Sequence, residues 1–329
     1  MSVPCVRVKR AEGESTRQRL AEANLLAEQW DLDVEGEFVF IPIADPGAVP
    51  PDLTVVPHEP PERDTQTMPA DVLGESPSYE RLGRLAIIDE DDSERAEQIA
   101  ASLWDSDLPI DGVLNRASKI KGRTRTRDWE ILRGSTTETI HREYGAEFAL
   151  DLDSVYFSPR LATERHRVIE QVESHEHAFD MFAGVGPFVI PMAQRGATVV
   201  GTDVNEIAIE YLRENARRNG VEDRVTGIVG DVRDVASDYE GWADRIVMNL
   251  PHSADEFLDT AVRLVGERAV IHYYDIQHES APFEPGEQAI RSAAEPSCEV
   301  DVLTRHEVRT YAPHEVNVVL DVELTRKQP

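Results

Sequence analysis

The sequence predicts an α/β protein with a doubly wound, mostly parallel sheet in its C-terminal half and two smaller α+β domains before it. Two observations support this. From about residue 177, short apolar runs alternate with amphipathic helical segments, a pattern typical of a parallel sheet with helices on both faces. The length of 329 residues also suffices for two or three domains, each with its own core.

The region before the sheet predicts two domains and a linker. The first, residues 1–56, has strand-like runs at 5–11 and 37–44 around a helix at 14–27. Residues 57–79 are rich in proline and charge and predict a linker. The second domain, residues 80–165, is expected to contain a strand at 84–89, a helix at 92–106, a basic stretch at 112–132 and a hairpin at 139–159 that turns at Tyr144 and Gly145.

The third domain, residues 166–329, follows a helix expected at 160–172 and carries the large sheet. Its predicted elements are strands at 177–182, 198–204, 224–232, 244–251 and 268–275, and helices at 186–195, 205–220 and 253–265. Residues 299–326 predict two further strands that pair antiparallel at the sheet edge.

The charge of the chain is strongly acidic. Asp and Glu number 63 against 34 Lys and Arg, a net charge of −29, and only four of the basic residues are lysines. This composition indicates a salt-adapted protein kept soluble by carboxylates. The sequence has no apolar run of membrane-spanning length and no leader-like start, so we expect a soluble cytoplasmic protein. Cys5 and Cys298 match no metal spacing.

Four consecutive strands of the third domain end in groups that suit a nucleoside ligand. Gly184 and Gly186 allow close backbone approach after the first strand, and Pro187 suits the first turn of a helix. Asp203 is placed to accept ribose hydroxyls, and Asp231 to accept an adenine amino group. Val189 stands where a dinucleotide site has its third glycine, which favours S-adenosylmethionine over NAD.

The fourth strand ends in Asn-Leu-Pro-His, residues 249–252. This resembles the [Asn/Asp]-Pro-Pro-aromatic motif of methyltransferases that act on planar N–H groups. The Asn249 carbonyl can accept a hydrogen bond from such a nitrogen and align its lone pair with the methyl group. Phe182, Val204, Val232 and Pro251 complete the expected cofactor site.

The longer motifs resemble the archaeal and eukaryotic tRNA (guanine-37-N1)-methyltransferases. They are "HREYGAEFALDLDSVYFSPRLATER", "DMFAGVGPF", "GDVRDV", "ADRIVMNLPHSADEFL" and "RTYAPHEVNVVLDVEL". The resemblance implies a class I S-adenosylmethionine-dependent methyltransferase domain of Rossmann-like fold, a monomer that needs no metal, and a first domain that contacts tRNA. The methyl group would pass to N1 of a guanosine 37 that leaves the anticodon-loop stack.

The resemblance also implies roles for individual residues. Glu164 matches the general base for the guanine N1 proton, although it could instead pair along its helix with Arg160 or Arg167. Arg125 matches the arginine that stabilises charge on guanine O6, with Arg123 and Arg127 as alternatives in this repetitive stretch. Tyr156 and Arg160 match positions near the flipped base. Arg165 matches a cofactor contact and is placed to meet the methionyl carboxylate, or it is a surface charge.

The basic stretch is the local exception to the acidic composition. Residues 116–133 hold seven basic and two acidic side chains, which favours a track for tRNA phosphates that includes Lys119, Lys121, Arg123 and Arg127. Two alternatives to methylation of tRNA remain open. One is aminocarboxypropyl transfer to a tRNA guanosine derivative, as in wybutosine synthesis, and the other is a non-catalytic tRNA-binding module.

Overall fold

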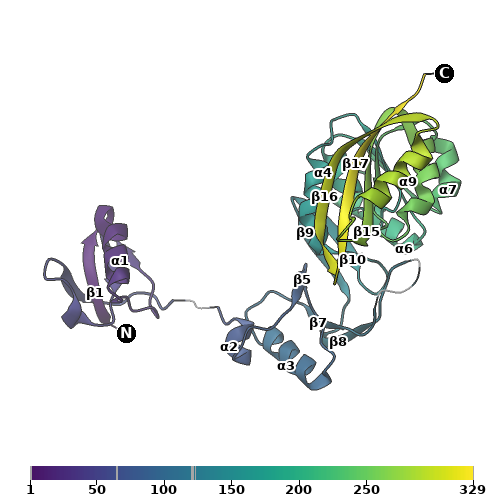
Figure 1. The fold of residues 1–329 in the computed structure, drawn as a ribbon. Coiled ribbons are helices and arrows are strands. Elements are labelled where there is room, and N and C mark those ends of the chain that lie inside the picture. The colour runs from purple at the N-terminus through teal and green to yellow at the C-terminus, as the bar shows by residue number, and fades with distance from the viewer. Residues whose placement is uncertain (1, 64–65, 120–121, 123, 329) are drawn as a thin grey trace. The chain divides into compact units, whose positions relative to one another are not determined.

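A computed structural model describes residues 2–63, 66–119, 122 and 124–328. The chain divides into two units, Met1–Met68 and Pro69–Pro329 (Figure 1). Among the described residues, no helix is both long and apolar enough to cross a membrane.

The first unit is a four-stranded antiparallel sheet in the order β2-β3-β1-β4, with one helix packed on it. Its elements are β1 (Val3–Lys9), α1 (Gly13–Glu22), β2 (Asp33–Glu35), β3 (Phe38–Pro42) and β4 (Thr54–His58). The strands expected at 5–11 and 37–44 are confirmed. Helix α1 ends earlier than expected, two residues before Asn24, which has a positive φ of 55°.

The second unit begins with α2 (Pro69–Leu73), which lies inside the predicted linker. A small sheet follows in the order β5-β6-β7-β8, covered by one helix. Its elements are β5 (Glu80–Leu82), β6 (Leu85–Ile88), α3 (Ser93–Trp104), β7 (Gly112–Arg116) and β8 (Trp129–Gly134). The basic residues between β7 and β8 therefore belong to a connection between two strands.

The predicted hairpin is confirmed as β9 (Glu138–Glu143) and β10 (Ala146–Asp151). Tyr144 and Gly145 both have positive φ, 45° and 87°, as a tight two-residue hairpin turn requires. Helix α4 (Ala162–Ile169) follows and contains the predicted domain boundary between residues 165 and 166. Leu85 of the small sheet, Phe148 of the hairpin and Val168 of α4 share one hydrophobic cluster with the large sheet.

The large sheet has seven strands in the order β13-β12-β11-β14-β15-β17-β16. They are β11 (His177–Asp180), β12 (Thr198–Asp203), β13 (Val225–Val229), β14 (Ala243–Met248), β15 (Val265–His278), β16 (Cys298–Ala312) and β17 (Glu315–Arg326). The five neighbouring strands β13, β12, β11, β14 and β15 pair in parallel, as predicted. The last two strands of the chain, β16 and β17, pair antiparallel. The last strand of the chain, β17, inserts between β15 and β16.

Helices cover both faces of this sheet (Figure 1). Helices α4, α5 (Val189–Gln194) and α6 (Glu206–Arg218) share a hydrophobic cluster with one face. Segment α7 (Val232–Val235), α8 (Leu258–Leu264) and α9 (Glu284–Ala294) pack on the other. Helix α9 was not predicted from the sequence. The strand order reverses between β11 and β14, so the carboxyl edge there is the expected place for a ligand.

Candidate active site

A cavity of about 640 Å³ opens at the carboxyl edge of the large sheet. Most residues predicted for the site line this one cavity. They are Arg125, Tyr156, Arg165, Phe182, Gly184, Asp203, Val204, Asp231, Val232, Asn249 and Pro251. The sequence therefore located the cavity and much of its wall.

The glycine turn after β11 forms part of the wall. Gly184 has a φ of 52°, and a Cβ added there would meet no protein atom within 4 Å, so the space in front of it is available to a ligand. Gly186 has a different role, because it does not line the cavity and packs against Ile190 and Leu212. Pro187 lies two residues before the assigned start of α5 at Val189, and the Ile190 N–H donates to the Gly186 carbonyl at 3.0 Å, so Pro187 lies in the first turn leading into the helix.

Asp203 ties the end of β12 to the glycine turn. Its Oδ2 accepts a hydrogen bond from the Gly184 N–H at 2.8 Å, and its Oδ1 accepts one from the Asn205 N–H at 2.9 Å. A carboxylate has about four acceptor positions, so these two bonds leave capacity for ribose hydroxyls. Burial raises the pKa of Asp203 despite its backbone donors.

Asp180, at the end of β11, lies beneath the same turn and is almost completely buried. Burial raises the pKa of its carboxyl group to about 7, in spite of a hydrogen bond from the Phe182 N–H and with the nearby charge of Asp203 adding to the effect. This side chain is thus much more easily protonated than an exposed aspartate.

Asp231 begins α7 as its N-cap, where Oδ1 accepts from the Arg233 N–H. The Arg233 guanidinium also pairs with this carboxylate at 2.6 Å and lies 4.8 Å from the centre of the Phe257 ring. The Phe182 ring meets Phe257 edge to face. These contacts give the cavity an apolar wall beside an acidic group, as an adenosine moiety requires.

The segment after β14 lines the middle of the cavity with Asn249, Leu250 and Pro251. His252, which ends the motif, has a φ of 118°, a strained conformation for a residue with a side chain. Its Nε2 lies 3.2 Å from the Tyr311 hydroxyl of β16. The motif is therefore connected to the C-terminal hairpin.

Arg125 enters the cavity from the connection between β7 and β8. It has a positive φ of 56°, and its guanidinium carbon lies 5.2 Å from the centre of the Tyr156 ring. Its Nε is buried and has no hydrogen-bond partner among the residues that the structure describes. A cation stacked on an aromatic ring with a donor unused is well suited to bind an anionic oxygen.

Arg165 lines the cavity and is nearly fully buried. Its Nε and Nη2 donate to the two oxygens of Glu143 at 2.7 and 2.6 Å, and Nη2 also donates to the Ser158 carbonyl. This geometry excludes the interpretation of Arg165 as a surface charge. Although burial opposes it, the bonds from Arg165 and His141 lower the pKa of Glu143.

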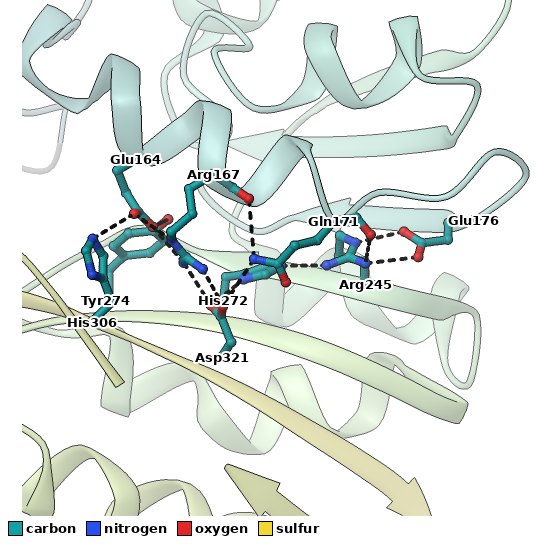
Figure 2. A network of polar contacts seen from close by, with 9 residues as sticks. All are labelled: Glu164, Arg167, Gln171, Glu176, Arg245, His272, Tyr274, His306 and Asp321. Atoms are coloured by element: carbon teal, nitrogen blue, oxygen red, sulfur yellow. Dashed lines mark hydrogen bonds and ion pairs between the residues drawn. The ribbon is translucent and has the colours of Figure 1, made fainter. Parts of the chain in front are cut away.

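Glu164 does not line the cavity. Its carboxylate, 3% exposed, accepts two hydrogen bonds from Arg167, and the Tyr274 hydroxyl donates to it at 2.7 Å (Figure 2). His306 Nε2 lies 3.6 Å away. The pairing along the helix with Arg167 that the sequence left open is therefore present, whereas Arg160 pairs with Glu80.

The Glu164 contacts continue into a buried polar network (Figure 2). Arg167 also donates to Asp321 of β17, which accepts further bonds from Gln171 and from His272 Nδ1. Burial alone would raise the pKa of Asp321, but the bonds from His272 and Arg167 lower it below its usual range. Burial lowers the pKa of His272, whose Nε2 faces Arg245.

Strand pairing places Glu164 close to the cavity although outside its wall. Tyr274 and His306 both stand opposite Val319, and Ile276 and Arg309 both stand opposite Asn317. Directly opposed residues share a face of the sheet. The two rows are two residues apart on β15 and β17, about 7 Å along the strands, and three residues apart on β16, where the register shifts between Glu307 and Arg309. Ile276, Asn317 and Arg309 line the cavity. Glu164 thus contacts Tyr274 and His306, and these residues form the row next to the one that lines the cavity.

Of the other predicted tRNA-contacting residues, Lys119, Arg127 and Arg160 are described by the structure and do not line the cavity. Lys119 is exposed, and the Arg127 guanidinium stacks on Trp129 at 5.4 Å. Burial and the charge of Arg116 lower the pKa of Arg127. Lys121 and Arg123 lie outside the described residues.

The sequence analysis assigned no role to the C-terminal hairpin, yet it supplies Arg309, Tyr311 and Asn317 to the cavity. Their stretch, "RTYAPHEVNVV", stood out only as part of a resemblance. No local pattern showed that β17 would insert beside β15 and turn these side chains toward the site.

Comparisons with known proteins agree with this geometry. Residues 139–303 match the TRM5/TYW2 methyltransferase domain, and residues 5–47 match the tRNA methyltransferase 5 N-terminal domain. The chain is 38% identical to the tRNA (guanine(37)-N(1))-methyltransferase Trm5b of Pyrococcus abyssi, over 97% of this chain and 98% of that protein.

Two further relatives are informative. The solved complex of aTrm5 with tRNALeu superposes with a TM-score of 0.79 at 32% identity, over 98% of this chain and 99% of that chain. A tRNA(Phe) (4-demethylwyosine(37)-C(7)) aminocarboxypropyltransferase of Pyrococcus horikoshii is 34% identical, over 68% of this chain and 80% of that protein.

Proposed function

The chain belongs to the TRM5/TYW2 methyltransferase family, and on this premise we propose how its residues act. It is an S-adenosylmethionine-dependent tRNA (guanine(37)-N1)-methyltransferase. The observation that carries this conclusion is that the similarity to the Trm5b enzymes extends over nearly the whole chain, with the N-terminal unit included. The similarity to two archaeal aminocarboxypropyltransferases covers only 68% and 75% of it.

The cavity fits the methyl donor. Asp203 retains acceptor capacity for the ribose, Asp231 lines the cavity where we place the adenine amino group, and Gly184 leaves the approach to the turn open. Phe182, Val204, Val232 and Pro251 supply apolar wall around these groups. For Arg165, Glu143 and Ser158 occupy Nε and Nη2, so Nη1 is the atom we assign to the methionyl carboxylate. When bound, S-adenosylmethionine supplies an electrophilic methyl group on a positively charged sulfur.

The residues on the acceptor side prepare guanine N1. Arg125 stabilises negative charge on O6 through its unused donor, and Tyr156 holds the Arg125 guanidinium by stacking. The Asn249 side chain holds the guanine edge so that the N1 lone pair faces the methyl group. The assignment of this role to Arg125 and not to Arg127 is supported by their positions. Arg125 lines the cavity, whereas Arg127 stacks on Trp129 outside the cavity wall.

Glu164 is assigned as the acceptor of the N1 proton. It is supported by its place next to the cavity floor and by the charges around it. Glu164 and Asp321 carry two negative charges against the one positive charge of Arg167, so one added proton makes this buried group neutral. The role also requires a movement, because the carboxylate does not line the cavity. Substrate binding must bring Glu164 and N1 together.

The tRNA is held outside the cavity by basic side chains in this proposal. Lys119, Lys121, Arg123 and Arg127 lie in the connection between β7 and β8, and Arg160 lies near the same region through its pair with Glu80 of β5. The predicted first domain, residues 1–56, contacts a more distant part of the tRNA, as its match to the tRNA methyltransferase 5 N-terminal domain supports. Residues 80–165 carry the phosphate track, and residues 166–329 carry the cofactor site.

The composition supports a salt-adapted enzyme, and we propose that it is cytoplasmic and, as the family resemblance implies, monomeric. A net charge of −29 with four lysines disfavours folding and tRNA binding alike at low salt, because surface carboxylates repel each other and the phosphates. Sedimentation and unfolding experiments between 0.1 and 3 M KCl test this (concentrations on the order of those in halophilic cytoplasm). A dimer, or full stability at low salt, would contradict it.

The decisive experiment is nucleoside analysis by mass spectrometry. An unmodified tRNA transcript with guanosine at position 37 is incubated with the protein and S-adenosylmethionine in molar KCl. We expect 1-methylguanosine, and none from a transcript with adenosine at position 37. An aminocarboxypropyl product from a wyosine-type precursor would support the alternative, and tRNA binding without any product would support a non-catalytic module.

A further inference from the structure

The cavity crosses the edge of the large sheet from one side to the other. Each strand, or the turn that follows it, contributes at least one lining residue, and one from each can be named in the spatial order of the strands. These are Asp231, Asp203, Gly184, Asn249, Ile276, Asn317 and Arg309, for β13, β12, β11, β14, β15, β17 and β16. The order of the groups in the cavity therefore follows the order of the strands.

The first four positions are Asp231, Asp203, Gly184 and Asn249. They carry the groups assigned to the methyl donor and to the place where the donor meets the methyl-accepting guanine. Adenine, ribose and the methionyl part occupy the cavity from Asp231 to Asn249 in the proposal above. The part over β15, β17 and β16 lies beyond that junction. Ile276 and Arg309 flank Asn317 in register, so their side chains share one face and form one wall.

Two polar atoms of this wall have no partner. Asn317 is 3% exposed, and its Oδ1 accepts no hydrogen bond. The Nε of Arg309 is also buried and unpaired. In the described part of the chain only four buried side-chain atoms lack a partner, and those of Arg125, Arg309 and Asn317 belong to residues that line this cavity. Since unpaired buried polar groups are costly and rare, they indicate a ligand that satisfies them.

The two groups differ in what they recognise. An arginine only donates hydrogen bonds, whereas the Asn317 Oδ1 only accepts them. A phosphate or a carboxylate has no N–H for Asn317. Guanine offers both kinds of group, with acceptors at O6 and N7 and donors at N1 and the 2-amino group.

We propose that Asn317 and Arg309 bind the target guanine, as the far wall of the acceptor half of the cavity. Asn317 accepts a hydrogen bond from an N–H of the base, and Arg309 donates to one of its acceptors. The inference rests on the proposed function and adds two specificity-determining residues to it.

The test compares binding of two tRNA transcripts that differ at one position. One carries guanine at position 37 and the other is abasic there, and both are titrated with S-adenosylhomocysteine present at one KCl concentration. We expect the wild type to prefer the guanine transcript, and this preference to fall about tenfold or more in Asn317→Ala and Arg309→Ala. Affinity for the abasic transcript should be unchanged.

Arg305→Gln is the matched control, since Arg305 lies on the same strand but pairs with Glu287 away from the cavity. It should keep the full preference. Asn317→Ala should unfold at the temperature of the wild type or above it, because it removes an unpaired buried group. A destabilised Asn317→Ala protein would indicate a structural role and overturn the proposal for that residue.

Other outcomes overturn the inference directly. Equal loss of affinity for both transcripts would make Arg309 a phosphate contact. Weaker binding of S-adenosylmethionine in calorimetry would make either residue part of the cofactor site. If both variants keep the preference while the wild type forms 1-methylguanosine, the inference fails and the proposed function stands. If the wild type forms none, the proposed function itself fails.

Discussion

Glu164 and Asp321 share the guanidinium of Arg167, which donates two hydrogen bonds to each carboxylate. Tyr274 and His272, which also contact these carboxylates, remain neutral at pH 7, because burial raises the pKa of Tyr274 and lowers that of His272. The three charged groups therefore carry one net negative charge. Asp321 has a lowered pKa, and in our proposal Glu164 is the carboxylate of this pair that accepts the proton of guanine N1.

Replacing Glu164 with glutamine should remove this proton uptake. We expect the single-turnover rate to fall by about 100-fold or more, with tRNA affinity nearly intact. Stability should fall by about 1–3 kcal/mol, because the glutamine NH2 group faces a donor of Arg167 in either orientation. Rapid-quench methylation assays and thermal unfolding measure the two effects. A variant that methylates at the wild-type rate would end the assignment of Glu164 as the base.

Replacing Asp321 with asparagine should weaken Glu164 as a base without touching the substrate. Arg167 would then face Glu164 as its single charged partner in the network, which favours the ionised carboxylate. We expect a rate about tenfold lower at pH 7 and an acid limb of the pH–rate profile shifted to lower pH. Single-turnover rates from pH 5 to 9 measure this, with exposed Asp301→Asn as the control. An unmoved acid limb in a slower enzyme would make Asp321 purely structural.

The cofactor site can be tested separately from the chemistry. Asp203→Ala removes the ribose acceptor and also leaves the Gly184 N–H without its bond. We expect S-adenosylmethionine affinity to fall by about 1–3 kcal/mol. Calorimetric titration measures the loss, and exposed Asp238→Ala serves as the control. Wild-type affinity in Asp203→Ala would place the ribose elsewhere.

Substitutions of Lys119 and Arg125 should affect different steps of the reaction. Lys119 is exposed to solvent, whereas Arg125 lines the cavity. Lys119→Ala should weaken tRNA binding and reduce the slope of log affinity against log salt by about one ion. Arg125→Ala should slow the chemical step by about 2–4 kcal/mol and change affinity little. Titrations at several KCl concentrations, with single-turnover rates, measure both. The reverse result would exchange the two roles.

Asp180 predicts a pH dependence of stability. Its pKa rises from 3.8 to about 7 on folding, so the folded state holds a proton that the unfolded chain releases. The free energy of unfolding should therefore fall from about pH 4 to pH 7 and level off above it. Asp180→Asn keeps an oxygen that accepts the Phe182 N–H. It removes the titrating carboxyl group and with it this pH dependence of the free energy of unfolding. Relative to the wild type, it should gain about 2–3 kcal/mol between pH 5 and pH 8.

Calorimetric unfolding at one KCl concentration measures the gain, with Asp238→Asn as the exposed control. An Asp180→Asn protein whose stability changes with pH in parallel to the wild type would contradict the raised pKa. The charge of the nearby Asp203 carboxylate also raises the pKa of Asp180. The two proteins should therefore be compared in the same buffers, so that Asp203 has the same ionisation in both.

Short-range features of this protein could be predicted from its sequence. The alternation of strands and helices, the turn at Tyr144 and Gly145, and the polar groups at successive strand ends depend on neighbours within a few residues. Asp203 and Asn249 were found in this way, because parallel strands bring their carboxyl ends to one edge. The roles of Glu164 and Arg125 came only from resemblance, and they stay predictions.

The tertiary structure decided what depends on residues far apart in the chain. Arg167 meets Asp321 across 154 positions, and no local pattern specifies which carboxylate a helix will face. Asn317 and Arg309 reach the cavity only because β17 inserts between β15 and β16. A strand pattern shows which residues alternate but not which strand lies beside which, since that order depends on how the whole sheet buries its two apolar faces.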